Sequence, residues 1–232
     1  ENPFEDLRSQ WQPVPPPAQG EGVDGFQQAS TLSIEESFIA GTTAIQAADA
    51  EGWVVSVTPS GGWIPAYVAG DTGVGLSQRM QSFVLDEAMN PYNVVEPGKR
   101  PRVTLTPSMA LKDGKPFFSF SIQGGDLQDQ NLLQFFLNLV EFDMNVQQAA
   151  EAHNISSYQM QASFGAHEAE PGRLVLTDQV PPFIRAQLEA MGYQVEVVER
   201  TYNPSMGIYF DTDQGVMHGG ASDYGDDYGI AW

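Results

Sequence analysis

The sequence predicts an α+β fold in which mostly antiparallel sheet is packed by helices. Predicted strands come early and late in the chain, with the predicted helices between them. Several neighbouring strands are joined by short turns that are typical of β-hairpins. No internal repeat or phosphate-binding P-loop is present, so a doubly wound parallel sheet is not favoured.

Residues 1–41 are predicted to be a linker rich in proline and glycine. Pro13, Pro15, Pro16 and Pro17 are followed within a few positions by three glycines, and both residue types disfavour helices and sheet ladders. Ser33 to Glu36 could form one short helical turn. The change in character at Gly41 places the start of the main domain, residues 42–232, at Thr42.

The first hairpin is predicted from two β-prone segments, 42–48 and 53–58, joined by the turn Asp49-Ala50-Glu51-Gly52. Residues 59–75 and 90–100 are predicted to be loops. A second hairpin joins 103–111 to 116–122 through Lys112-Asp113-Gly114-Lys115, because Asp-Gly between apolar runs is a strong turn signal.

Gly124 and Gly125 precede a predicted helix at about 128–142, whose wide apolar stripe is typical of a buried helix. Asn145 is a plausible N-cap for a second helix, with Gln148 three residues later. The remaining predicted elements are strands at 173–176, 193–198, 206–210 and 215–217, and a helix at 181–191 that ends before Gly192.

Composition excludes several classes of function. The chain has 232 residues with 30 acidic and 10 basic side chains, a net charge of −20, so nucleic acids and anionic membrane surfaces are unfavourable partners. No apolar run approaches the ~20 residues that a membrane span needs. The absence of cysteine excludes thiol catalysis, disulfides and thiolate metal sites. The acidic surface and a first residue that is not methionine favour a processed protein in a periplasmic or extracellular setting over a cytoplasmic one.

Eight short blocks occur in an order that resembles one family. They are GTT at 41–43, DAEG at 49–52, VAGDTG at 68–73, PGKRP at 97–101, KDGKP at 112–116, QGGDLQ at 123–128, DMNVQQAAEA at 143–152 and GGASDYGDD at 219–227. The set resembles the small subunit of γ-glutamyltransferases, which are N-terminal-nucleophile (Ntn) hydrolases, and is closest to their acylase-like branch. The resemblance implies a four-layer αββα sandwich, a precursor that cuts itself into a large and a small subunit, and a small-molecule amide substrate. Residues 1–41 would then be the end of the large subunit, which would be a partner of residues 42–232.

Thr42 is the residue that the resemblance identifies as the nucleophile. A threonine hydroxyl needs a base, and cleavage of the Gly41–Thr42 bond would free an α-amine with an ordinary pKa of about 8. The amine could accept the hydroxyl proton, so Thr42 would supply both nucleophile and base. Spacing alone would favour the alternative that Thr42 and Thr43 are ordinary strand residues.

The resemblance also assigns an oxyanion hole to the backbone N–H groups of Gly124 and Gly125. A strand-to-helix turn that needs glycine is an alternative compatible with the same residues. Ser60 occupies the position of a second hydroxyl that hydrogen-bonds the nucleophile. Thr43, Arg79, Ser82 and Thr104 are predicted substrate-binding residues, and Arg79 lies where the acylase branch has an Asn-Arg-Gly element.

Two departures from the family pattern concern the substrate. True γ-glutamyltransferases hold the substrate's α-amine with an aspartate near the position of Ser82 and a hydroxyl near that of Val103. A neutral hydroxyl and an apolar side chain cannot form that charge-assisted contact. Glutathione-like substrates are therefore not favoured, and the acyl group could lack an α-amine.

No cofactor or metal is expected. The three histidines, His153, His167 and His218, are scattered and have no spacing typical of metal ligands, so a surface or structural role is favoured. The leading hypothesis is an amidohydrolase or acyltransferase that processes itself at Gly41–Thr42. One alternative is a non-catalytic relative that binds a ligand or partner, and a weaker one is an acidic structural or secreted protein that shares only the fold.

Overall fold

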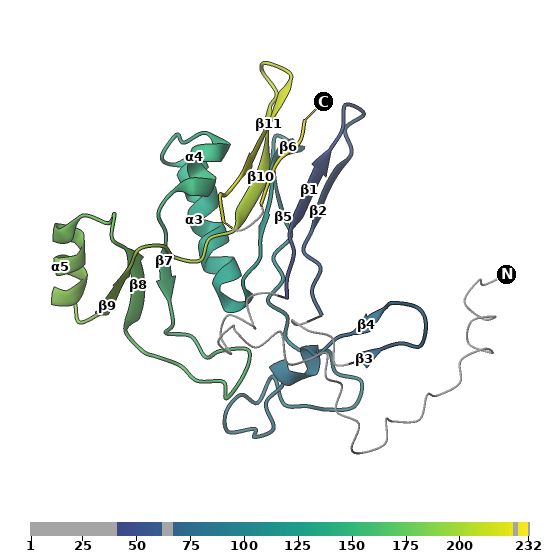
Figure 1. The fold of residues 1–232 in the computed structure, drawn as a ribbon, viewed down its shortest axis with the longest axis vertical. Helices are drawn as coiled ribbons and strands as arrows, with labels where there is room; N and C mark the ends of the chain where they lie inside the picture. Colours follow the sequence, from purple (N-terminus) through teal and green to yellow (C-terminus); the bar gives the residue numbers. More distant parts are fainter. Residues whose placement is uncertain (1–40, 62–66, 225–226, 232) are drawn as a thin grey trace.

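The computed structural model describes residues 41–61, 67–224 and 227–231 (Figure 1). Residues 1–40 of the predicted linker, including the helical turn at Ser33 to Glu36, lie outside the described residues. The chain is α+β, as predicted. Its elements run in the order β1 (Ile45–Ala48), β2 (Val54–Val57), β3 (Tyr67–Val68), β4 (Gly75–Leu76), η2 (Arg79–Ser82), β5 (Ser108–Lys112), β6 (Lys115–Ile122), η3 (Gly125–Leu127), α3 (Gln128–Val140), α4 (Val146–Glu151), β7 (Ile155–Ser157), β8 (Arg173–Thr177), α5 (Pro182–Ala190), β9 (Gln194–Val198), β10 (Ser205–Asp211) and β11 (Val216–Ala221).

The central sheet has four antiparallel strands in the order β11-β10-β6-β5. The predicted turn between β5 and β6 is confirmed, and both of its central residues have positive φ, 53° at Asp113 and 75° at Gly114, as a type I′ turn requires. The strand predicted from residue 103 begins only at Ser108. Pro107 directly before it has no N–H to donate to a ladder, which accounts for the late start.

Alternation along β6 separates the two faces of this sheet. Phe118, Phe120 and Ile122 pack against α3 and α4, where Leu132 and Phe135 are also buried. The rings of Phe118 and Phe135 meet edge to face with centroids 5.2 Å apart. The α4 helix begins with the predicted capping box, in which Asn145 accepts from the Gln148 N–H and the Gln148 side chain accepts from the Asn145 N–H.

The opposite face of β6 carries Ser119 and Ser121, which are fully buried against the β1–β2 hairpin. Gln46 on β1 hydrogen-bonds both hydroxyls. Helices α3 and α4, the four-stranded sheet and the β1–β2 hairpin therefore form three successive layers (Figure 1). Because the hairpin pairs β1 and β2 antiparallel, its open end brings residue 42 close to residue 60.

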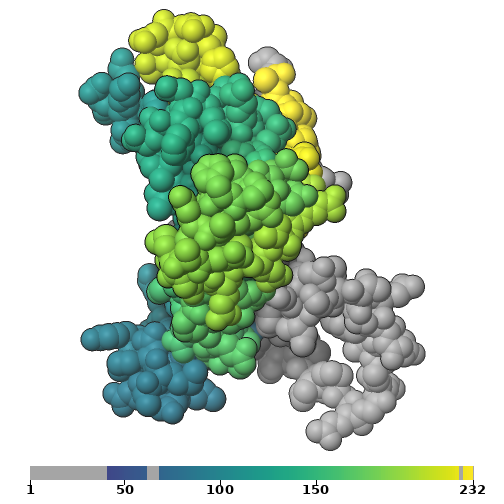
Figure 2. All heavy atoms as spheres, turned by 90° about the vertical axis from the view of Figure 1, so that its left-hand side faces the viewer, coloured from purple at the N-terminus to yellow at the C-terminus, as the bar shows by residue number. Residues whose placement is uncertain are grey.

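A second unit contains the three-stranded sheet β7-β8-β9 and the helix α5. The β8 and β9 strands are parallel and joined through α5. They are the one parallel pair among the named strands of the described residues, beside an isolated parallel bridge between Val84 and Val94. None of the α5 residues is buried, and its light green atoms lie on the displayed face in Figure 2. The short elements β3, β4, β7 and η2 are not among the predicted ones. Among the described helices, none is long and apolar enough to span a bilayer.

Candidate functional site

Thr42 lies at the open end of the first hairpin, before β1 begins. A single antiparallel bridge joins Thr42 to Ser60, and the Thr43 N–H donates to the Pro59 carbonyl at 3.2 Å. Only 6% of Thr42 is exposed. The backbone pairing by itself therefore places Thr42 beside Ser60.

Two hydroxyls and one carbonyl form a short hydrogen-bond chain at this bridge. The Thr42 Oγ1 hydroxyl donates to Ser60 Oγ at 3.1 Å. The Ser60 hydroxyl in turn donates to the Gly41 carbonyl at 3.2 Å. The same serine thus contacts both the candidate nucleophile and the carbonyl of the bond that would be cleaved.

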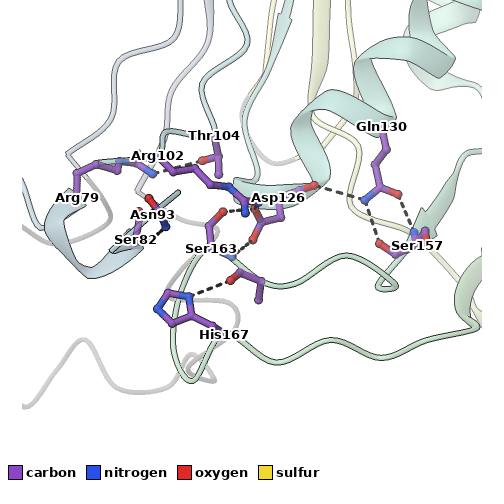
Figure 3. A network of polar contacts seen from close by, with 11 residues as sticks. Arg79, Ser82, Asn93, Arg102, Thr104, Asp126, Gln130, Ser157, Ser163 and His167 are labelled. Atoms are coloured by element: carbon purple, nitrogen blue, oxygen red, sulfur yellow. Dashed lines mark hydrogen bonds and ion pairs between the residues drawn. The ribbon is translucent and has the colours of Figure 1, made fainter. Parts of the chain in front are cut away.

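Arg79 approaches the serine from η2 and is itself buried, with 7% exposure. Its Nη2 donates to Ser60 Oγ at 3.1 Å. Its Nη1 donates to Thr104 Oγ1 at 3.3 Å, as Figure 3 shows. Desolvation lowers the pKa of the Arg79 guanidinium, and the negative charge of Asp126 opposes that shift. The guanidinium also lies over the Phe164 ring, 5.4 Å from its centroid.

The glycine pair forms the turn between β6 and α3. Its φ angles are 129° at Gly124 and 56° at Gly125, both in the region that favours glycine. A Cβ atom on Gly124 would lie 2.3 Å from Cε1 of Tyr202, so this position also needs glycine for packing. A Cβ on Gly125 would lie 3.5 Å from Phe164. The predicted strand-to-helix turn is therefore confirmed, whereas its role as an oxyanion hole stays a prediction.

A continuous set of contacts links the glycine turn to Thr42. It runs from Gly125 to Phe164, from Phe164 to Arg79, and from Arg79 through Ser60 to the Thr42 hydroxyl. The open end of the β1–β2 hairpin, the end of β6 and the start of α3 all lie at the lower end of the central sheet in Figure 1, above the η2 region. The four predicted catalytic residues therefore belong to one region.

The predicted substrate-binding residues lie in different environments. Thr43 is exposed, whereas Thr104 is 9% exposed and accepts from Arg79. Both hydrogen bonds of Arg79 described above go to protein hydroxyls. Ser82 is fully buried, and its Oγ has no hydrogen-bond partner among the described residues. The substrate contacts of these residues stay predictions.

Three neighbours of the glycine turn were not singled out from the sequence. Asp126 follows the glycine pair and binds both Ser163 and Arg102 (Figure 3). Phe164 packs on Gly125. Asp126 belongs to the QGGDLQ block, but no local signal identifies residues 163 and 164, which lie in an irregular segment. In the described part of the chain, no group of three or more carboxylates or histidines could hold a metal ion.

Tyr202 packs over Gly124, and burial raises the pKa of its phenol above the ordinary value of 10.0, with further contributions from Tyr224 and Asp227. The ring of Tyr224 meets that of Tyr202 edge to face at 4.7 Å. The neutral Tyr202 ring therefore packs against the glycine turn at Gly124, and Phe164 lies beside the turn at Gly125.

Comparisons with known proteins agree with this architecture. The family model for gamma-glutamyltranspeptidase matches residues 19–232. The "Glutathione hydrolase-like YwrD proenzyme" of Bacillus subtilis is 36% identical over 166 residues, which are 69% of this chain and 30% of that protein. The "Acylase ACY 1 proenzyme" of Pseudomonas sp. (strain SE83) is 28% identical over 182 residues, 78% of this chain and 30% of that protein.

A solved structure, the cephalosporin acylase from Bacillus halodurans, superposes with a TM-score of 0.70 at 26% identity and covers 83% of this chain and 36% of that one. The chain thus spans about a third of the length of the relatives that it matches. The range that the family model matches, residues 19–232, includes the hairpin, the central sheet and the glycine turn. On these matches, the chain belongs to the gamma-glutamyltranspeptidase family of Ntn hydrolases and has acylase-like relatives.

Proposed function

We propose that this chain is the catalytic small-subunit portion, residues 42–232, of an amidohydrolase or acyltransferase that cleaves its own precursor between Gly41 and Thr42. The observation that carries the proposal is the placement of Ser60. Its Oγ accepts from the Thr42 hydroxyl at 3.1 Å and donates to the Gly41 carbonyl at 3.2 Å. One side chain thus orients the attacking group and polarises the group under attack.

In the self-cleavage that we propose, Thr42 Oγ1 attacks the carbonyl carbon of Gly41. The carbon–nitrogen bond breaks, the hydroxyl proton ends on the departing nitrogen, and the acyl group now forms an ester with the Thr42 oxygen. Water hydrolyses this ester, which leaves a carboxylate on Gly41 and a free α-amine on Thr42. Arg79 can only donate to Ser60, so the Ser60 hydroxyl hydrogen is left for the Gly41 carbonyl.

Turnover of an amide substrate would then use the freed amine as the base. The amine takes the proton of the Thr42 hydroxyl as its oxygen attacks the substrate carbonyl, and the proton passes to the leaving amine when the tetrahedral intermediate collapses. The N–H groups of Gly124 and Gly125 would stabilise the oxyanion of that intermediate. The resulting ester on Thr42 is released by water in hydrolysis, or by a second amine in transfer.

We propose that the acyl group lacks a positively charged α-amine. The family's aspartate falls near the position of Ser82, which is fully buried and neutral here. The other departure, Val103, is 56% exposed and apolar. Neither offers the carboxylate that would offset the desolvation of an ammonium group.

We further propose that the preceding part of the precursor covers the outer face of the β1–β2 hairpin and completes the four-layer αββα sandwich. That face exposes Ile45, Val55 and Val57 by 48%, 44% and 40%. Strands normally bury such a face. The chain spans only 30% of the length of its proenzyme relatives, so a precursor of their length would have ample sequence to cover this face. A periplasmic or extracellular location is part of the same proposal, as is a large subunit that contributes to the substrate pocket.

Two p-nitroanilides that differ only in the α-amine test this function on the full-length precursor. They are the γ-anilide of glutamate and the mono-anilide of glutarate. We expect release of p-nitroaniline with the glutaryl compound preferred, and an acyl adduct that peptide mass mapping places on Thr42. The absence of any adduct from Thr42 would favour the non-catalytic alternative. A preference for the γ-glutamyl compound would refute the proposal about the acyl group alone.

A further inference from the structure

The glycine turn is followed by a carboxylate whose position poses a physical problem. Asp126 is the residue directly after Gly125, within η3. An oxyanion that develops at the Gly124 and Gly125 amides would be repelled by a carboxylate so close in the chain. An electrostatic role alone would favour a neutral residue at this position, so another requirement accounts for the aspartate.

The contacts of Asp126 indicate what that requirement is. Its Oδ2 accepts the backbone N–H of Ser163 at 2.7 Å, and its Oδ1 accepts the Ser163 hydroxyl. Oδ1 also accepts from Arg102 at 3.1 Å, and this ion pair partly neutralises the carboxylate (Figure 3). Ser163 is only 1% exposed, so Asp126 binds a buried residue of this segment, although residues 165, 166 and 168 beside it are exposed.

The segment around Ser163 forms the loop 162–168, which is tied closed by its own hydrogen bonds. The Ala162 N–H donates to the Glu168 carbonyl at 2.8 Å, and the His167 N–H donates to the Phe164 carbonyl at 3.1 Å. The His167 ring lies between two carbonyls, 3.0 Å from that of Ala162 and 3.1 Å from that of Phe83. The loop is therefore fastened at one end to the glycine turn and at the other to the end of η2.

Phe164 connects this loop to both halves of the candidate site. Its ring is 3.5 Å from the Cβ position of Gly125 and lies under the Arg79 guanidinium at 5.4 Å. Arg79 in turn binds Ser60, the partner of Thr42. A shift of the loop would consequently change the position of the Gly125 amide relative to the nucleophile.

We propose that Asp126 and Ser163 are a positioning pair, which fixes the Gly124 and Gly125 amides against Phe164 and hence at a set distance from Thr42. Neither side chain touches the reacting atoms. Arg102 reduces the negative charge that the arrangement introduces. This inference rests on the proposed function for its catalytic consequence, whereas the fixing of the turn itself is independent of catalysis.

The two explanations predict opposite effects of Asp126→Asn. If the carboxylate acted only through its charge, its removal would speed acylation. If the carboxylate positions the turn, the asparagine side chain keeps one acceptor oxygen but turns its NH₂ group toward a donor of Ser163 or Arg102. The turn then loosens and acylation slows. We expect kcat to fall about 10–100-fold with little change in KM, less than the ~10²–10³ loss when an oxyanion donor is removed. Ser163→Ala should lower kcat similarly, and Ser163→Thr should restore most of it, because it keeps the hydroxyl.

The matched control is Asp129→Asn, since Asp129 is an exposed aspartate in the first turn of α3. In the full-length protein, kcat and KM for glutaryl-p-nitroanilide are measured beside amide hydrogen exchange of the peptide that covers residues 123–128. We expect faster exchange and lower kcat in Asp126→Asn and Ser163→Ala only. Unchanged exchange, or a kcat equal to or above wild type, would overturn the positioning role. A wild-type protein that forms no Thr42 adduct would refute the proposed function instead, and the exchange data would still decide whether the pair fixes the turn.

Discussion

Replacement of Arg79 by methionine tests whether a buried cation organises the nucleophile. The substitution keeps an unbranched side chain about as long as the aliphatic part of arginine but removes the donors to Ser60 and Thr104, at 3.1 and 3.3 Å. Each hydrogen bond from a charged donor contributes about 1.5–3 kcal/mol. The loss is partly offset because the guanidinium no longer has to be desolvated. We expect the free energy of unfolding to fall by about 1–3 kcal/mol.

The substitution should also lower the rate of catalysis. Without Arg79, the Ser60 oxygen loses one of two fixed donors, and the Thr42 hydroxyl loses a rigid partner. Misplacement of a reacting group by about 1 Å can lower the rate ~10²-fold. Urea unfolding and the rate of p-nitroaniline release measure the two effects. Arg100→Met, at an exposed arginine, is the control and should change stability by less than about 0.5 kcal/mol. A fully active, self-cleaved Arg79→Met protein would refute the reasoning.

Three further substitutions test the turn and the core. Gly124→Ala places a Cβ 2.3 Å from Tyr202 at a φ of 129°. Backbone strain alone costs about 1–3 kcal/mol. We expect acyl labelling of Thr42 to be lost even where circular dichroism shows a folded protein. Phe135→Ala removes a ring that is 2% exposed and should lower the free energy of unfolding by about 3–5 kcal/mol in urea titrations. Burial raises the pKa of Tyr202 above 10.0, so the stability linked to the neutral phenol is fully present below pH 10 and is lost as the pH rises from there through the folded-state pKa. Tyr202→Phe should flatten that decline in unfolding measurements above pH 10, and an unchanged slope would contradict it.

Local signals in the sequence predicted much of the fold. The Asp-Gly turn at 113–114 and the Asn145 capping box depend on neighbouring residues, and the structure confirms both. The parallel pairing of β8 with β9 was not predicted. The β3 and β4 strands were missed because each has only two residues, too few to show an alternation.

Some residues of the candidate site could likewise be predicted from the sequence, whereas others were identified only from the structure. Thr42 and the glycine pair could be named from the ordered family blocks, and Ser60 from the family position of a second hydroxyl. The glycine turn is where the sequence predicts it. The contact of Arg79 with Ser60 spans 19 residues, and that of Ser163 with Asp126 spans 37. Such contacts depend on how distant elements pack. No periodicity or turn residue in a single sequence encodes that packing, so the arrangement behind the glycine turn emerged only from the structure.

The central claim is that Thr42 becomes a free amino terminus. Intact-mass measurement of the full-length precursor, alone and as Thr42→Ala, tests it directly. We expect the wild-type protein to separate into two chains whose masses place the break between Gly41 and Thr42, and the variant to remain one chain. A wild-type protein that hydrolyses an amide substrate while the Gly41–Thr42 bond stays intact would contradict the account.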